Sequence, residues 1–204
     1  MTTLLRTTYL HCCATLVALC WFAPSARADL VTSYNVFAGH EVRLSGFINS
    51  AGTPAGPIGS NLDVRTSASG RFSSLAGGGT LYGTGIGPDI SGNVPFGGNV
   101  NLSELTTVGG NVAAGGNANL QGTISGDVIA AATVNSKAAI AGDLIGGGNV
   151  TTSALGLVAG NLISNGDVHA GANVTGNVNY GLGHTISTSP GVSIGGSVTT
   201  SNYA

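Results

Sequence analysis

The chain has 204 residues, of which only 7% are charged and 35 are glycine, and its formal net charge is −2. Globular domains carry roughly 25% charged residues and about 7% glycine. This composition leaves no basic patch that could neutralise phosphates, so we expect no nucleic-acid partner. Val, Ile and Leu recur at regular positions between the glycines. A disordered chain would lack that apolar content, so we expect a folded repeat.

Residues 1–28 are predicted to be a signal peptide. Arg6 supplies the positive end, Cys12–Phe22 the apolar stretch, and Ala26 and Ala28 the small residues before a cleavage site. An uncleaved anchor is the alternative, although the stretch is short for a membrane span. No later apolar run reaches the span length of about 20 residues, so we expect no membrane span after signal removal. The expected location is extracellular or at the cell surface, with the periplasm as a further possibility.

The three cysteines, Cys12, Cys13 and Cys20, all lie in this N-terminal segment. The mature chain would therefore have no disulfide, no thiolate nucleophile and no cysteine metal ligand. Lipidation of Cys20 is an alternative, but Leu19 replaces the small residue expected before a lipidated cysteine.

Residues 29–65 are predicted to form an N-terminal cap of irregular β structure, because the first open edge of a solenoid has to be covered. Residues 66–91 are predicted to be irregular early turns that lead into the repeat. An independent small domain is the alternative for the N-terminal part. The glycine-rich stretch Gly77–Gly87 lacks the Lys-Ser/Thr of a phosphate loop, so it is interpreted as a turn region.

Residues 92–204 are predicted to be a β-solenoid. Gly-Asn/Asp-Val/Leu triplets start at Gly92, Gly110, Gly126, Gly142, Gly160 and Gly176, and a looser copy starts at Gly196. Repeats this short cannot bury an apolar face alone, so neighbouring turns must stack.

Three columns of apolar residues recur in each repeat. The first contains Val94, Val112, Val128, Leu144, Leu162, Val178 and Val198; the second contains Val100, Ala118, Val134, Val150, Val168 and Ile186; the third contains Val108, Ile124, Ile140, Val158, Val174 and Ile194. Such spacing does not follow the 3.6-residue period of a helix, and β-branched residues favour strands. We therefore predict an all-β chain: a single-stranded parallel β-helix, three-sided and right-handed, with 16–18 residues per turn.

Two polar columns are predicted at the corners. The first contains Asn93, Asn111, Asp127, Asp143, Asn161 and Asn177, and the second contains Asn99, Asn117, Thr133, Asn149 and Asp167. Side-chain amides stacked at strand spacing can hydrogen-bond along the stack, which is the structural interpretation. Calcium bound by Asp127 and Asp143 is the alternative, although calcium normally takes six to eight oxygen ligands.

No catalytic residue and no cofactor-binding residue is predicted. The acidic residues are scattered, and no Gly-x-Ser-x-Gly elbow accompanies His40, His169 or His184. We expect no enzyme activity and no cofactor.

The stretches Gly142–Val150, Gly166–Val174 and Ser189–Val198 carry a resemblance to known families. In these stretches the chain resembles bactofilins, which are polymer-forming bacterial β-helices. It also resembles exported Gly-Asn-Val repeat proteins of the PEP-CTERM or choice-of-anchor type. Bactofilins lack a signal peptide, and surface sorting would need a tail after Ala204.

The resemblance and the open strand edges of a solenoid together predict a structural, self-associating protein of the cell surface or extracellular matrix, with itself as main partner. The alternative is an adhesin or carbohydrate-binding module that uses a flat face against a surface polysaccharide. For that face the sequence offers small polar residues interpreted as outward-facing: Thr151, Thr152, Thr199 and Thr200.

Overall fold

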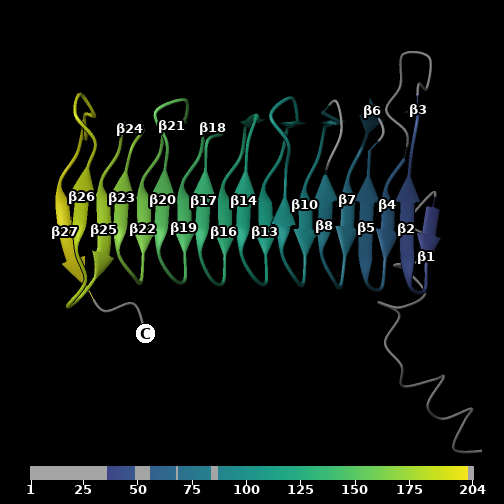
Figure 1. Cartoon of the computed structure of the whole chain (residues 1–204), viewed down its shortest axis with the longest axis horizontal. Coiled ribbons are helices and arrows are strands. Elements are labelled where there is room, and N and C mark those ends of the chain that lie inside the picture. The colour runs from purple at the N-terminus through teal and green to yellow at the C-terminus, as the bar shows by residue number, and fades with distance from the viewer. Residues whose placement is uncertain (1–35, 49–55, 68, 84–86, 202–204) are drawn as a thin grey trace, which may run out of the picture. The chain divides into compact units, whose positions relative to one another are not determined.

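The computed structural model describes residues 36–48, 56–67, 69–83 and 87–201, which belong to the compact unit Asn35–Ala204. The predicted signal segment lies outside the described residues. Within them every regular element is a β-strand, and all strand pairs are parallel (Figure 1). No described segment forms a helix long and apolar enough to cross a membrane.

The strands form three parallel sheets. The 10-stranded sheet contains β1 (Val36–Ala38), β4 (Ile58–Ser60), β7 (Leu75–Gly77), β10 (Val94–Phe96), β13 (Val112–Ala114), β16 (Val128–Ala130), β19 (Leu144–Gly146), β22 (Leu162–Ser164), β25 (Val178–Gly181) and β27 (Val198–Ser201). The 9-stranded sheet contains β2 (Glu41–Leu44), β5 (Asp63–Thr66), β8 (Leu81–Gly83), β11 (Val100–Asn101), β14 (Ala118–Leu120), β17 (Val134–Ser136), β20 (Val150–Thr152), β23 (Val168–Ala170) and β26 (Ile186–Thr188). The 8-stranded sheet contains β3 (Phe47–Ile48), β6 (Ser69–Phe72), β9 (Asp89–Ile90), β12 (Thr107–Val108), β15 (Thr123–Ile124), β18 (Ala139–Ile140), β21 (Leu157–Val158) and β24 (Asn173–Val174).

Each turn of the chain contributes one strand to each sheet, which confirms the predicted β-solenoid. The register also confirms the three apolar columns: Val112 pairs with Val128, Val134 with Val150, and Ile124 with Ile140. The third column continues to Ile194 through an isolated bridge from Val174. The predicted first and second columns likewise end at Val198 and Ile186.

The three sheets begin well before Gly92. In the segment assigned to a cap, β1 pairs with β4 and β2 with β5, both in parallel. In the segment assigned to irregular turns, β7, β8 and β9 continue the three sheets into β10, β11 and β12. The described residues between 36 and 91 therefore contribute turns of the same solenoid, although this segment lacks the Gly-Asn-Val triplet.

Several central strands bury a second residue besides the one in the predicted apolar column. They are β10, β13, β16 and β22 of the 10-stranded sheet and β14, β17, β20 and β23 of the 9-stranded sheet. In β16, for example, Val128 and Ala130 point inward while Ile129 points out. Several of these second positions hold buried hydroxyls, such as Ser136, Thr152 and Ser164. Ser164 is fully buried and donates to the carbonyl of Gly148 at 2.8 Å, while its oxygen accepts from Gly166 N–H at 3.1 Å. The buried Ser164 hydroxyl therefore forms hydrogen bonds with backbone groups at a corner of the solenoid.

Removal of a column side chain should destabilise the whole stack. Leu144 is fully buried, so Leu144→Ala should lower the free energy of unfolding by about 2–5 kcal/mol. Its neighbour Ile145 points outward on the same strand, so Ile145→Ala provides a matched control with a smaller expected loss. Urea denaturation followed by circular dichroism measures both. Equal losses for the two variants would contradict the inward column.

Candidate functional site

The first corner column forms a continuous hydrogen-bonded ladder. In each step the side-chain Oδ1 of one turn accepts the backbone N–H of the equivalent residue in the next turn, at 2.7 to 2.9 Å. The acceptors are Asn93, Asn111, Asp127, Asp143, Asn161 and Asn177, and the last donor is Ser197. The predicted stacking is therefore present, but its main bond joins side chain to backbone. Since the hydrogen bond needs only an acceptor oxygen, either Asn or Asp can occupy a position in this column.

The residue before each ladder residue has to be glycine, because its Cα lies too close to the turn below for a side chain to fit. A Cβ on Gly142 would collide with Oδ1 of Asp127 in the turn below, and with the backbone of Gly126. The same clash with the Oδ1 below occurs at Gly110, Gly126, Gly160, Gly176 and Gly196. None of these glycines has a positive φ; in the described residues that conformation occurs only at Gly46, Gly122, Gly183 and Gly191. An Asn or Asp in the ladder of one turn therefore requires a glycine before the ladder residue of the next turn.

The second corner column is interrupted at one turn. Asn99 accepts from Asn117 N–H at 2.7 Å, and Asn117 accepts from Thr133 N–H at 3.1 Å. Thr133 carries no Oδ1, and the ladder starts again where Asn149 accepts from Asp167 N–H at 2.9 Å. Because no Oδ1 projects from Thr133, a Cβ on Gly148 above it would meet no atom closer than 3.4 Å.

Both calcium candidates are members of the ladder. Asp127 Oδ1 accepts from Asp143 N–H at 2.9 Å, and Asp143 Oδ1 accepts from both the backbone and the side-chain amide of Asn161. No group of three or more His, Cys, Asp or Glu side chains that could hold a metal occurs in the described parts of the chain. One oxygen of each carboxylate therefore already has a structural partner.

Asp167 is the acid with the most ladder partners. Its Oδ1 accepts from the backbone N–H of Thr185 at 2.8 Å and from the Thr185 hydroxyl at 3.0 Å, and His184 Nδ1 lies 3.5 Å away. These contacts, the Thr185 N–H first, lower the pKa of the Asp167 carboxyl below its ordinary value. Asp167 and His184 are both exposed, and the Thr185 hydroxyl donates to the same Asp167 oxygen that accepts the Thr185 N–H, so we interpret the group as a structural corner.

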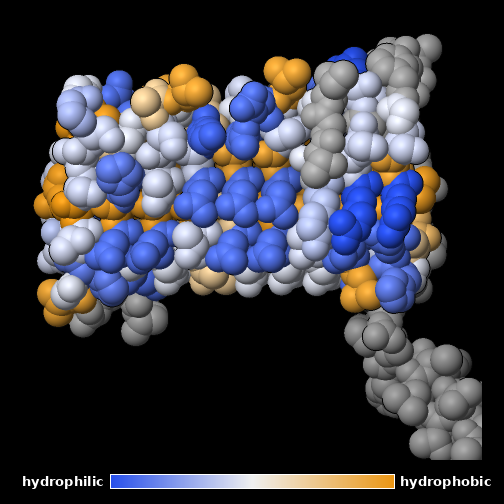
Figure 2. All heavy atoms as spheres, in the orientation of Figure 1, coloured by the Kyte–Doolittle hydropathy of each residue, from blue (hydrophilic) through white to orange (hydrophobic). Residues whose placement is uncertain are grey.

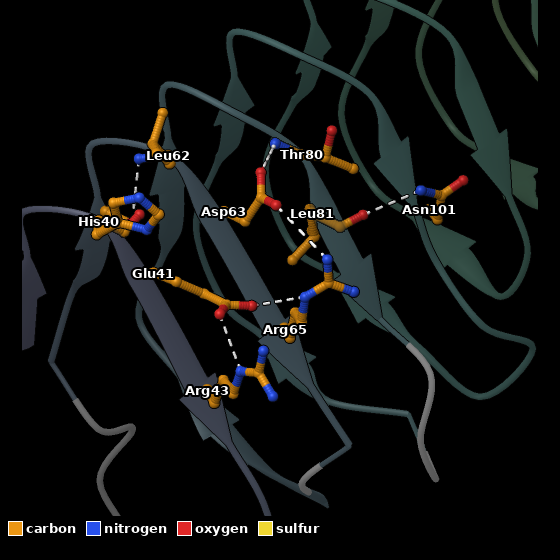
Figure 3. Close-up of polar contacts among 10 residues, drawn as sticks. His40, Glu41, Arg43, Leu62, Asp63, Arg65, Thr80, Leu81 and Asn101 are labelled. Carbon is orange, nitrogen blue, oxygen red and sulfur yellow. Dashed lines mark hydrogen bonds and ion pairs between the residues drawn. The ribbon is translucent and has the colours of Figure 1, made fainter.

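A second charged group lies at the other end of the 9-stranded sheet (Figure 3). Glu41 on β2 accepts from Arg43 Nε at 2.9 Å and from Arg65 Nε on β5 at 2.5 Å. The Arg43 hydrogen bond is the largest cause of the lowered pKa of the Glu41 carboxyl. Arg65 also lies 3.8 Å above the ring of Tyr82 on β8 and 3.6 Å from Asp63. These charges pair with one another across neighbouring turns, which is typical of a surface ion-pair network.

The rest of this face is polar and uncharged. Outward side chains Asn101, Asn119 and Asn135 form a row in which Asn119 Nδ2 donates to Asn101 Oδ1 at 2.8 Å, and Asn135 Nδ2 to Asn119 Oδ1 at 3.1 Å. Figure 2 shows hydrophilic side chains in rows across these strands. His169 continues the outward positions and contacts the Ser187 hydroxyl at 2.9 Å.

One of the four threonines assigned to an outward face is buried. Thr151, Thr199 and Thr200 are partly or fully exposed, as expected. Thr152 is only 2% exposed, and its Oγ1 accepts from the backbone N–H groups of Gly171 and Ala172 at 3.2 Å. The expectation for Thr152 was wrong because alternate residues of a strand face opposite sides.

The outer face of the 10-stranded sheet is apolar at its middle. Ile129, Ile145 and Ile163 occupy paired outward positions on β16, β19 and β22. Ile129 is half exposed and the other two are partly covered. The two larger sheets therefore present chemically different surfaces.

Comparison with protein-family models, curated proteins and solved structures finds no match for this chain. We therefore infer its function from the fold and from the side chains described above.

The steric role of the ladder glycines can be tested with two substitutions at equivalent corners. Gly142→Ala should destabilise the protein by about 1–3 kcal/mol, because its Cβ would overlap Asp127 and Gly126. Gly148→Ala should be neutral or slightly stabilising, since its Cβ has space and alanine restricts the unfolded chain. Thermal and urea unfolding measure both. Similar effects of the two substitutions would contradict the steric explanation.

The Asp167 corner predicts a pH dependence of stability. Because folding lowers the pKa of this carboxyl, its contribution is complete above the ordinary value near 4 and is lost as the pH falls through the lowered value. The variant Asp167→Asn keeps an Oδ1 acceptor but does not titrate. Unfolding measured between about pH 6 and about pH 2 should show a greater acid loss for the unsubstituted protein than for the variant. Equal acid losses would exclude a titrating role for Asp167.

Proposed function

We propose that this protein is an exported structural protein that self-associates end to end through the open strand edges of its solenoid. The observation that carries the proposal is the position of β26 and β27. They are the last strands of the 9- and 10-stranded sheets, and each pairs on one side only with a strand of the described residues. Unpaired N–H and C=O groups at such an edge are a template for another strand.

The C-terminal turns carry few features that would block pairing. Between Gly181 and Ser201 there is no Asp, Glu, Lys or Arg, and no proline follows Pro190. Val198 on β27 is 45% exposed at this edge, and at the opposite end Val36 on β1 is 47% exposed. Charge and proline are the usual protection of an edge strand, so their absence from β27 favours association.

Joining β27 of one copy to β1 of the next would continue all three parallel sheets. Such a contact uses two different surfaces of the molecule, and because it stacks the copies along one axis it extends into filaments. Polymer formation of this kind is also what the resemblance to bactofilins implies, and a place at the cell surface is what the resemblance to PEP-CTERM or choice-of-anchor proteins implies. The predicted signal peptide supports the exported location.

The second candidate is an adhesin or carbohydrate-binding module. The row Asn101, Asn119 and Asn135 supports it, because this flat polar face offers regularly spaced amides to a polysaccharide. Self-association requires the ends of the solenoid, whereas binding of this kind requires a face.

The end-to-end proposal predicts different results for two exposed apolar positions of the same sheet. Val198→Lys should abolish concentration-dependent assembly, because it places a charge on the terminal edge. Ile129→Lys should leave assembly intact, because Ile129 is 50% exposed on the outer face, away from either end. Light scattering over a concentration series, with negative-stain microscopy, measures assembly.

Two outcomes would contradict this proposal. One is an unsubstituted protein that stays monomeric at every concentration. The other is assembly that is lost in Ile129→Lys and kept in Val198→Lys, which would assign association to the isoleucine face. Retention of glycan binding by a monomeric Val198→Lys variant would favour the face-binding candidate.

A further inference from the structure

Turns of two lengths occur in the middle of the solenoid, and the difference lies in the connections between the 9- and 8-stranded sheets. The connections β11–β12 and β20–β21 are long, and each contains a tight turn. In the first, Thr106 N–H donates to Ser103 O at 3.1 Å, and in the second, Gly156 N–H donates to Ser153 O at 2.8 Å. The two turns between them, with β14–β15 and β17–β18, have shorter connections. Two projections therefore stand on either side of a gap of two turns.

This gap is a groove of about 450 Å³. Leu105 and Glu104 line one wall and Leu155 the other, while the floor contains Gln121, Thr123 and Lys137. The walls are three strand spacings apart, or about 14 Å. The volume lies within the range of roughly 300–1,000 Å³ that is typical of ligand sites. Figure 2 shows separate apolar projections along this margin, with hydrophilic side chains between them.

The floor and walls are held by buried contacts. Gly122 has φ +90°, and a Cβ there would collide with the carbonyl of Thr106, so only glycine lets the floor pass close over the turn below. Thr106 is 1% exposed and its Oγ1 lies 3.2 Å from the Ser103 hydroxyl within the first projection. On the second side Thr152 is buried beneath the projection. The groove is therefore a preformed part of the scaffold.

The walls nevertheless expose large apolar side chains. Leu105 is 68% and Leu155 is 86% exposed, although neither packs into the described core. Exposed leucines on both sides of a concave surface provide apolar contact area for a ligand that lies between them.

Lys137 gives the groove its charge preference. The described arginines Arg43, Arg65 and Arg71 are all in ion pairs, whereas Lys137, the one lysine of the chain, makes no ion pair with any described residue. It lies on the turn adjacent to the Leu155 projection, and Glu104 lies on the opposite wall. An anionic group would therefore be attracted to the Leu155 side of the floor.

The surroundings of Lys137 are rich in neutral hydrogen-bonding groups. A second hollow of about 200 Å³ shares Gln121 and Lys137 with the groove, and its other lining residues include Asn119, Asn135 and Thr151. Amides and hydroxyls around one cation match a ligand that has many hydroxyl groups and a carboxylate.

We infer that the groove between the Ser103–Thr106 and Ser153–Gly156 projections binds an acidic polysaccharide, with Lys137 as the partner of a uronate carboxylate. The leucine walls then contact the C–H faces of the sugar rings, and the amides of the floor bind the hydroxyls. This inference does not depend on end-to-end association, since the groove lies far from both terminal strands in the order of turns.

Binding of oligogalacturonate to the full chain tests the inference, and its methyl-esterified form, which has the same rings without the charge, is the matched ligand control. Isothermal titration calorimetry should show binding of the acid that weakens with added salt, and little binding of the ester. Lys137→Gln should raise the Kd about tenfold or more, and Lys137→Arg should restore binding. Arg71→Gln, at an exposed ion-paired arginine outside the groove, should have no effect.

The apolar walls are tested in the same assay. Leu155→Ser should weaken binding, whereas Leu182→Ser, at a leucine that is 64% exposed outside the groove, should not. Equal affinity for acid and ester, unchanged affinity of Lys137→Gln, or absence of binding would each overturn the inference. Tighter binding of an oligoglutamate peptide than of oligogalacturonate would overturn it as well, in favour of an acidic polypeptide.

Discussion

The hydrogen bond from a backbone N–H to the Asn or Asp Oδ1 of the preceding turn is the contact on which this solenoid depends. It fixes one corner of each turn directly above the last, and it requires glycine at the preceding position, as Gly142 above Asp127 illustrates. Once the corner is fixed, the following residue falls into the first apolar column. Few charges and no disulfide are needed, because packing and backbone hydrogen bonds repeat at every turn.

The sequence predicted the solenoid from Gly92 onward because two signals coincide there, the apolar columns and the Gly-Asn/Asp dipeptide. Before Gly92 the columns exist but the dipeptide does not, so Ile58 and Leu75 could not be placed in register by inspection, although they pair with each other.

The second inward positions were missed for a chemical reason. Residues such as Ser136, Thr152 and Ser164 have the composition of a surface, and only the described backbone carbonyls and N–H groups beside them explain their burial. For the candidate site, the ladder residues were predictable from their spacing in the sequence. The groove was not, because it forms only when two turns with longer connections are stacked on either side of two shorter ones.

The regular stack also separates stability from surface chemistry. The inward side chains pack, and the ladder residues form their hydrogen bonds, between neighbouring turns. Outward positions can therefore change without loss of the fold. The same scaffold thereby carries an ion-paired end at Glu41 and Arg65, an amide row at Asn119, and an isoleucine row at Ile145. In the turns that contain β11–β12 and β20–β21, the extra residues lie in a single connection, where Leu105 and Leu155 project.

The ladder has a direction. Every Oδ1 acceptor lies on the earlier turn and every donor on the later one, and the final donors Thr185, Ser193 and Ser197 carry no amide or carboxylate of their own. The ladder side chains of a completed turn therefore offer their acceptors to the turn that follows it in the chain. Turns that form in chain order would therefore each find side-chain acceptors already in place on the turn before. At the C-terminal end these bonds finish at hydroxyl residues, which offer no Oδ1 to a further turn.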